Sequence, residues 1–230
     1  MIAWPADRGT LQLVKALLIL TLMVAFEGRI VAGETIWLLD NQAKIGGHAV
    51  TIFGEPALRT EAGAAAIWFD GVQDGLWLRD IPFSGQSQFT IEILFQPAAD
   101  GPTEQRFFHS EDTQGRRALI ETRLDGKGGW WLDTFIVTPA AGPGVTLVDP
   151  RCVHPTGRWY WAALRYDGKT MAHFVNGRKE REERVPFEKF GPGQTSLGVR
   201  QNKVHWFKGA IREVRFHSRP VADDDLQRVR

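Results

Sequence analysis

Trp159-Tyr-Trp-Ala-Ala-Leu-Arg-Tyr-Asp-Gly168, followed by Phe174-Val-Asn-Gly177, is the stretch of this chain that decides its fold. Apolar and polar residues alternate in both pieces, which is the period of a half-buried β-strand. Asp-Gly and Asn-Gly are two-residue hairpin signals, because a type I′ turn needs a positive φ at both central positions. The two signals lie nine residues apart, a spacing typical of short antiparallel strands in a β-sandwich. The sequence therefore predicts an all-β fold here.

The same alternation continues through the rest of the chain. Residues 88–96 place Phe89, Ile91, Ile93 and Phe95 on one face. Three further strands form a predicted meander at 106–109, 117–124 and 130–137. Asp70-Gly71 predicts a hairpin between strands at 67–69 and 76–78. The charge run Lys179-Glu-Arg-Glu-Glu-Arg184 has strand period and indicates a solvated edge strand.

Four other pieces carry a family resemblance: Phe69-Asp-Gly-Val-Gln-Asp-Gly-Leu-Trp-Leu78, Phe89-Thr-Ile-Glu-Ile-Leu-Phe-Gln-Pro97, Thr195-Ser-Leu-Gly198 and Phe207-Lys-Gly-Ala-Ile-Arg-Glu-Val-Arg-Phe216. In this order, and together with the opening stretch, they resemble bacterial laminin-G-like (LamG, concanavalin A-like) domains. The resemblance implies a two-sheet antiparallel jelly-roll sandwich whose first strand pairs with its last. It leaves the function open, because this fold hosts lectins, receptor modules, lyases and hydrolases.

The N-terminus has the pattern of a secretory signal peptide. Lys15 precedes the apolar run Ala16-Leu-Leu-Ile-Leu-Thr-Leu-Met-Val-Ala-Phe26, and Val31-Ala-Gly33 supplies small residues for cleavage. We therefore expect a signal peptide at 1–33, a single jelly-roll domain at 34–230, and a periplasmic or secreted mature protein without a transmembrane span. The alternative is an uncleaved N-terminal membrane anchor.

Net charge bears on the class of partner, and cysteine content bears on the source of stability. The chain has 28 Lys and Arg against 27 Asp and Glu, and the leader takes away three basic and two acidic residues, which leaves the mature chain near neutrality. Such a balance gives no basic footprint for nucleic acid. Cys152 is the single cysteine, so stability has to come from the core rather than from an internal disulfide.

The candidate site comes from the strand faces that point away from the predicted core. Alternation leaves Glu121 and Arg123 on the outer face of one strand, and Trp131 and Asp133 on the same face of the next. In 159–166, the resemblance to LamG-like domains implies that Tyr160, Ala162, Leu164 and Tyr166 form the core face, which leaves Trp159, Trp161 and Arg165 on the outer face. The predicted ligand-binding residues are Glu121, Arg123, Trp131, Asp133, Trp161, Arg165 and Arg200.

Indole rings beside charged groups suit a sugar. The apolar face of a pyranose ring stacks on tryptophan, and its hydroxyl groups bond to guanidinium and carboxylate. The alternative is a cross-strand ladder of salt bridges without a ligand. The expected partner is accordingly a polysaccharide or other glycan, or an extracellular protein.

No catalytic residue is predicted. Glycosidases on this fold commonly carry E-x-D-x-x-E on one strand, and this chain has no such run. Ile120-Glu-Thr-Arg123 and Trp206-Phe-Lys-Gly209 distantly resemble segments of alginate-lyase-like sandwiches, but Trp206 replaces their tyrosine. The leading hypothesis is a secreted non-catalytic binding module. A lyase or glycoside hydrolase on the same fold is the alternative, and a structural envelope protein is a third hypothesis.

A calcium ion is the one cofactor that the resemblance implies. Such domains often hold Ca²⁺ at the rim of the sandwich. The candidate ligands near turns are Asp40, Asp70, Asp74 and Asp80, although aspartate also favours turns for its own hydrogen bonding.

Overall fold

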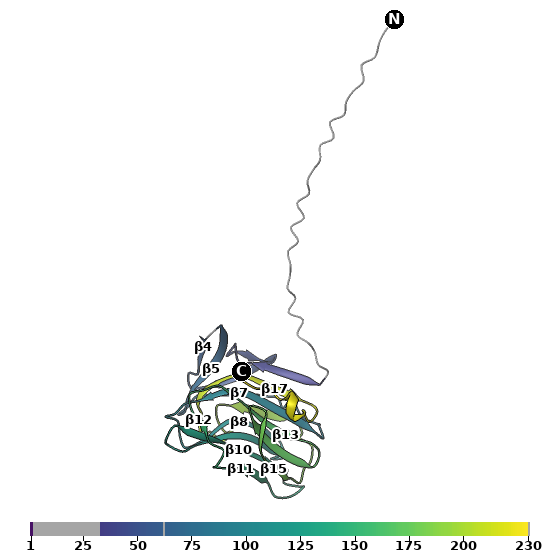
Figure 1. Cartoon of the computed structure of the whole chain (residues 1–230). Coiled ribbons are helices and arrows are strands. Elements are labelled where there is room, and N and C mark those ends of the chain that lie inside the picture. The colour runs from purple at the N-terminus through teal and green to yellow at the C-terminus, as the bar shows by residue number, and fades with distance from the viewer. Residues whose placement is uncertain (2–32, 62, 230) are drawn as a thin grey trace. The chain divides into compact units, whose positions relative to one another are not determined.

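The computed structural model describes Met1, residues 33–61 and residues 63–229. Of the predicted leader only Met1 and Gly33 fall within these ranges, so the signal peptide stays a prediction. Two antiparallel sheets stack with a shared apolar core between them (Figure 1). This confirms the predicted all-β jelly-roll sandwich. The described residues include no helix with the length and apolarity that a bilayer crossing requires.

The eight-stranded sheet is built around the last strand of the chain. Its spatial order is β15 (Arg178–Arg184), β14 (Thr170–Val175), β13 (Tyr160–Tyr166), β7 (Phe89–Pro97), β17 (Lys208–His217), β5 (Ala64–Asp70) and β4 (Ala57–Glu61). β1 (Glu34–Leu38) also pairs with β17, which confirms that the first strand joins the last. β15 forms the edge and is largely exposed, as its charge run predicts.

The nine-stranded sheet contains the predicted meander. Its order is β11 (Val145–Val148), β10 (Gly129–Val137), β9 (Arg117–Leu124), β8 (Glu104–Asp112), β16 (Gly193–Leu197), β6 (Gly75–Leu78), β3 (His48–Phe53) and β2 (Lys44–Ile45), and β12 (His154–Pro155) pairs with β10. β8, β9 and β10 are thus sequential neighbours, as the alternation indicates.

Aromatic rings from both sheets fill the core. Phe95 of β7 stacks on Phe107 of β8 with ring centroids 4.3 Å apart, and it meets Trp130 of β10 edge-on at 5.1 Å. All three side chains are fully buried. Flat, bulky side chains suit the space between two stacked sheets.

Of the three predicted hairpins, those at Asn176-Gly177 and Asp167-Gly168 are present, and the one at Asp70-Gly71 is not. Asn176 and Gly177 have φ values of 47° and 71°, the conformation of a type I′ turn. At Asp167-Gly168 only the glycine has a positive φ, because the Asp167 carboxylate accepts the backbone N–H groups of Lys169 and Thr170 and closes a longer loop.

The predicted hairpin at Asp70-Gly71 is a crossover between the sheets. β5 and β6 flank it, but they belong to different sheets. Asp70 Oδ1 accepts the backbone N–H groups of Val72, Gln73 and Asp74 at 2.8–3.0 Å. The carboxylate stabilises the turn that leads the chain from one sheet to the other.

The C-terminal segment covers part of the outer face of the eight-stranded sheet (Figure 1, yellow). It contains a short 3₁₀ helix, η1 (Asp223–Asp225). Val221 and Leu226 pack on Ala163 and Phe174 of that sheet. The backbone N–H of Gln227 donates to Glu92 at 2.7 Å, so even the charged residue of β7 is buried there.

His173 makes the stability of the fold depend on pH. Burial lowers the pKa of His173 to about 3, and its Nδ1 lies 3.1 Å from the hydroxyl of Thr134 in the core. Between pH 6.5 and about 3 the unfolded chain therefore binds a proton that the folded chain does not. From this histidine alone, the free energy of unfolding should fall with pH by up to about 1.4 kcal/mol per unit.

The test compares wild type with His173→Gln by urea unfolding at pH 7 and pH 4.5. We expect the variant to be destabilised less, relative to wild type, at pH 4.5 than at pH 7, because glutamine does not titrate. A difference in unfolding free energy that is the same at both pH values would contradict the assignment.

Candidate functional site

Strand register places charged residues in rows on the outer face of the nine-stranded sheet. Arg106 of β8 lies opposite Glu121 of β9, which lies opposite Asp133 of β10. In the next row, Arg123 of β9 lies between Glu104 and Trp131. Because alternate residues of a strand share a face, both rows point away from the core.

These rows form a connected ion-pair network. Arg123 contacts Asp133 Oδ2 through Nε at 2.8 Å and through Nη2 at 2.7 Å. It also lies 2.7 Å from Glu104 and 3.5 Å from Glu121. Arg106 Nε lies 3.0 Å from Glu121, and its Nη1 contacts Glu104. Two guanidinium groups therefore hold three carboxyl groups in fixed positions.

The two central carboxyl groups are removed from water although they lie on an outer face. Glu121 and Asp133 are each 3% exposed. Burial raises the pKa of Glu121 to about 7, and the nearby Asp133 adds to this while Arg106 and Arg123 oppose it. Burial also raises the pKa of Asp133, against the effect of Arg123. Glu121 can therefore gain or lose a proton near neutral pH.

A hollow of about 240 Å³ opens over this network. Ligand pockets commonly measure about 300–1,000 Å³, so this one suits a single small group such as one sugar residue. Its lining mixes four guanidinium groups with two carboxyl groups and three less polar side chains: Arg106, Arg117, Arg123, Arg200, Glu121, Asp133, Leu119, Phe135 and Thr146.

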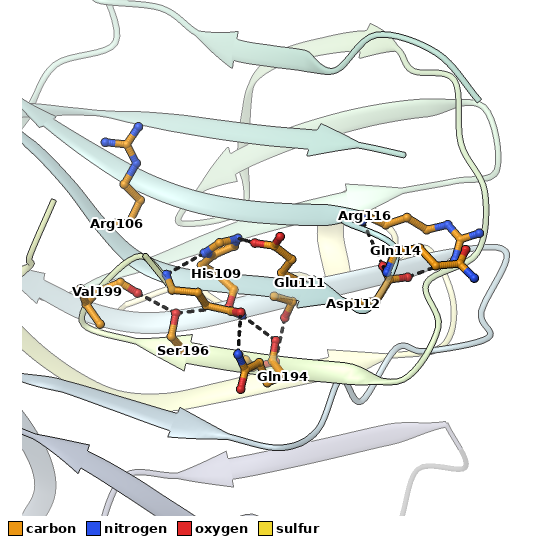
Figure 2. Close-up of polar contacts among 12 residues, drawn as sticks. Arg106, His109, Glu111, Asp112, Gln114, Arg116, Gln194, Ser196 and Val199 are labelled. Atoms are coloured by element: carbon orange, nitrogen blue, oxygen red, sulfur yellow. Dashed lines mark hydrogen bonds and ion pairs between the residues drawn. The ribbon is translucent and has the colours of Figure 1, made fainter. Parts of the chain in front are cut away.

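A buried histidine anchors the loop that brings Arg200 to the hollow. The backbone N–H of Gln201 donates to His109 Nδ1 at 3.0 Å, so the ring proton is on Nε2, 3.2 Å from Glu111. Figure 2 shows the contact between His109 and Glu111, with Arg106 on the same strand. A second hollow of about 530 Å³ adjoins here, lined in part by Glu111, Gln194 and Gln201.

The structure brings together five of the seven predicted site residues. Glu121, Arg123, Asp133 and Arg200 line the hollow. Trp131 is half-buried on the same face, directly opposite Arg123.

Trp161 and Arg165 lie on the other sheet, so the prediction of one face shared by all seven residues is wrong. Their strand, β13, pairs with β7 and β14 rather than with β10. The Trp161 ring packs near Arg215, whose Cζ is 5.4 Å from the ring centroid. Arg165 donates to the carbonyl of Val221 at 2.7 Å and pairs with Asp223, which ties it to the C-terminal segment.

Five residues that line the hollow were not predicted to bind a ligand, and the sequence signals for them differ: Arg106, Arg117, Leu119, Phe135 and Thr146. Arg117 and Phe135 have the same strand parity as Glu121 and Asp133, so alternation alone would have included them. Leu119 shares that parity too, although it reads as an ordinary core residue. Arg106 becomes part of the site only because β8 pairs with β9, which places it opposite Glu121.

Two of the four calcium candidates, Asp70 and Asp74, accept hydrogen bonds from turn backbone. Besides its three bonds from the following turn, Asp70 donates its own backbone N–H to Asp74 Oδ2 at 3.0 Å. Asp74 Oδ1 accepts the N–H of Glu55 at 2.8 Å, and Asp80 lies 3.4 Å from His48. Across residues 33–61 and 63–229, the His, Cys, Asp and Glu side chains form no group of three or more that could hold a metal ion. Calcium binding, at Asp40 or elsewhere, stays a prediction.

Comparison with known proteins identifies the family. The family described as the concanavalin A-like lectin/glucanases superfamily matches residues 70–227. No curated protein sequence matches the chain.

Solved structures share the fold at low sequence identity. Domain 4 of AbnA, a GH43 extracellular arabinanase from Geobacillus stearothermophilus in complex with arabinotriose, is 19% identical with a TM-score of 0.63, covering 84% of this chain and 96% of that one. The botulinum neurotoxin serotype D binding domain is 11% identical, with a TM-score of 0.61 and coverage of 84% and 50%. The serotype D ligand-binding domain in complex with N-acetylneuraminic acid is also 11% identical, with a TM-score of 0.61, covering 84% of this chain and 49% of that one. The chain thus spans about half the length of the neurotoxin chains that it matches.

The ion-pair network predicts a pH-dependent cost for losing Arg123. Arg123→Met removes the main partner of Asp133 and one partner of Glu121, which should lower the free energy of unfolding by about 3 kcal/mol at pH 8. The loss should be smaller at pH 5, because the two carboxyl groups, whose pKa values burial already raises, become protonated more readily without the arginine. Chemical unfolding at both pH values measures this. An equal loss at pH 5 and pH 8 would show that the two carboxyl groups do not depend on Arg123.

Proposed function

Since the chain belongs to the concanavalin A-like lectin/glucanase superfamily, we propose that it is a non-catalytic carbohydrate-binding module. One observation carries this proposal: rigidly held donors and acceptors lie beside aromatic rings on the outer face of the nine-stranded sheet. Arg123, Glu121 and Asp133 supply the polar groups, and Phe135 and Trp131 supply the apolar surface.

Preorganisation makes this face suitable for a sugar. The ion pairs already hold the long side chains in place, so a ligand has little side-chain entropy to overcome on binding. Sugar hydroxyl groups can donate to carboxylates and accept from guanidinium groups, which are the stronger kinds of hydrogen bond. A half-buried indole offers contact to the apolar face of the ring.

Two of the similar structures support the choice of ligand class. The arabinanase domain is in complex with arabinotriose, and a neurotoxin ligand-binding domain is in complex with N-acetylneuraminic acid. Both share the fold of this chain at low identity. An extracellular protein partner remains the second kind of ligand that the sequence predicts.

We place this module outside the cytoplasm. The apolar run at 16–26, after Lys15 and before Val31-Ala-Gly33, supports cleavage of residues 1–33 and release to the periplasm or beyond. N-terminal sequencing of the exported protein tests this, and a mature chain that begins at Met1 would contradict it.

A polysaccharide-cleaving enzyme is the alternative, and the proton affinity of Glu121 favours it. A carboxyl group with a pKa near 7 directly opposite Asp133 resembles the acid and base pair that glycosidases need. Against it, the carboxylate of each residue is engaged by an arginine. Assays for new reducing ends and for unsaturated products across a polysaccharide panel decide between the two, and turnover that Glu121→Gln abolishes would establish the enzyme.

The binding proposal predicts a specific loss in Trp131→Ala. Against the tightest-binding glycan of an array, we expect about tenfold weaker binding, since aromatic stacking contributes about 1 kcal/mol or more. Trp159→Ala is the matched control, because that half-buried indole packs under Arg212 of the eight-stranded sheet, 4.3 Å from its Cζ. Isothermal titration calorimetry measures both affinities. If both variants bind the glycan equally weakly, or if Trp131→Ala binds it as tightly as wild type, the ligand does not bind on this face.

A further inference from the structure

Two arginines of the hollow differ from the other two in having no carboxylate partner. Arg106 and Arg123 pair with Glu104, Glu121 and Asp133. Among the described residues, neither Arg117 nor Arg200 has an acidic oxygen within 4.0 Å. The hollow thus has a neutralised half and a half with uncompensated positive charge.

Arg117 is held in place without a hydrogen-bond acceptor. Its Nε atom is buried and makes no hydrogen bond, as is also true of Nε and Nη1 of Arg106, but those two atoms lie beside Glu121 and Glu104. Its guanidinium carbon lies 5.9 Å from the ring centroid of Phe135, so the aromatic ring restrains the group by a cation–π contact. Buried donors in folded proteins are rarely left without an acceptor, and Arg117 lines the hollow, where a ligand can offer acceptors to the rest of its guanidinium group.

The neighbouring acidic residue does not fill this role. Glu111 lies opposite Arg117 across β8 and β9, and Arg117 and Arg200 both help to lower the pKa of its carboxyl group. Its carboxylate turns instead to His109, at 3.2 Å (Figure 2). The Glu111 carboxylate is therefore in contact with His109 rather than with either arginine.

We propose that Arg117 and Arg200 bind the carboxylate or sulfate group of an acidic sugar residue seated in this hollow. This inference rests on the proposed carbohydrate-binding function and names its ligand class. A guanidinium group matches the planar, paired oxygens of a carboxylate or sulfate through two parallel hydrogen bonds. Phe135 lies against the same hollow and provides contact for the ring carbons.

A neutral sugar would leave the two guanidinium groups without an anion in a partly dehydrated hollow. An acidic sugar supplies charge-assisted hydrogen bonds to both, which should favour it over its uncharged counterpart by roughly ten- to a hundredfold. The preference should weaken as salt concentration rises, because salt screens the attraction between exposed charges.

The experiment uses a glycan array of matched pairs. Oligogalacturonate, oligoglucuronate and sialyllactose are each printed beside their methyl esters, sulfated chondroitin and heparin fragments beside their desulfated forms, and neutral arabino- and gluco-oligosaccharides complete the set. We expect binding to the charged members and at least tenfold weaker binding to their uncharged partners. The esters identify a carboxylate ligand, and the desulfated forms identify a sulfate ligand.

The possible failures are distinguishable. Equal binding within the pairs, or binding only to neutral glycans, overturns the acidic-sugar inference and leaves the carbohydrate-binding function standing. Binding to no glycan overturns both.

Variants locate the effect at the two arginines. Arg117→Gln and Arg200→Gln should each reduce the preference for the charged member at least tenfold, with thermal unfolding used to confirm the fold. Arg184→Gln is the control, because it removes one positive charge from the exposed edge strand of the other sheet. If this control weakens binding as much as the two hollow variants do, net charge rather than this site attracts the glycan, and the inference is wrong.

Discussion

The pairing of β17 on both of its edges is the constraint on which the eight-stranded sheet depends. One edge bonds to β7 along most of its length. The other edge bonds first to β5 and then to β1, with a bulge between Ile211 and Glu213 near the change of partner. Without β17, three groups of strands would lose their connection. Because these partners lie far apart in sequence, the sheet closes only through non-local contacts, a feature of slow-folding topologies.

Buried carboxyl groups on the two outer faces of the sandwich have different surroundings. On the eight-stranded sheet, the C-terminal segment lies across β7 and β13, and Glu92 is satisfied by Gln227 and by His217 at 2.9 Å. Under that segment, the Glu92 carboxylate is bonded inside the protein. On the nine-stranded sheet, Glu121 and Asp133 are equally buried but lie at the floor of a hollow. These two carboxyl groups therefore lie where a ligand in the hollow could reach them.

Strand alternation determined how much could be predicted from the sequence. It places Ile120, Leu132 and Leu164 in the core and Glu121, Arg123 and Asp133 outside, because the side-chain period of a strand is a local property. The Asn176-Gly177 turn is local for the same reason. Alternation does not say which sheet a strand joins, and this is why Trp161, although on an outer face, is separated from Asp133. The step from β5 to β6 was misjudged likewise, since hairpins and crossovers can share the same turn residues.

The same gap explains why half of the site escaped prediction. Arg106 reaches the hollow through the pairing of β8 with β9, and Thr146 through the pairing of β11 with β10, neither of which leaves a pattern in the sequence. The salt-bridge ladder, which is the alternative to a ligand site, accounts for only two of the four arginines in the hollow. Arg106 and Arg123 belong to this ladder, because each forms ion pairs with neighbouring carboxyl groups. Among the described residues, Arg117 and Arg200 have no carboxylate partner, although both line the hollow. In the proposed site the ladder is the rigid frame, and we propose that the ligand is recognised at its unpaired end.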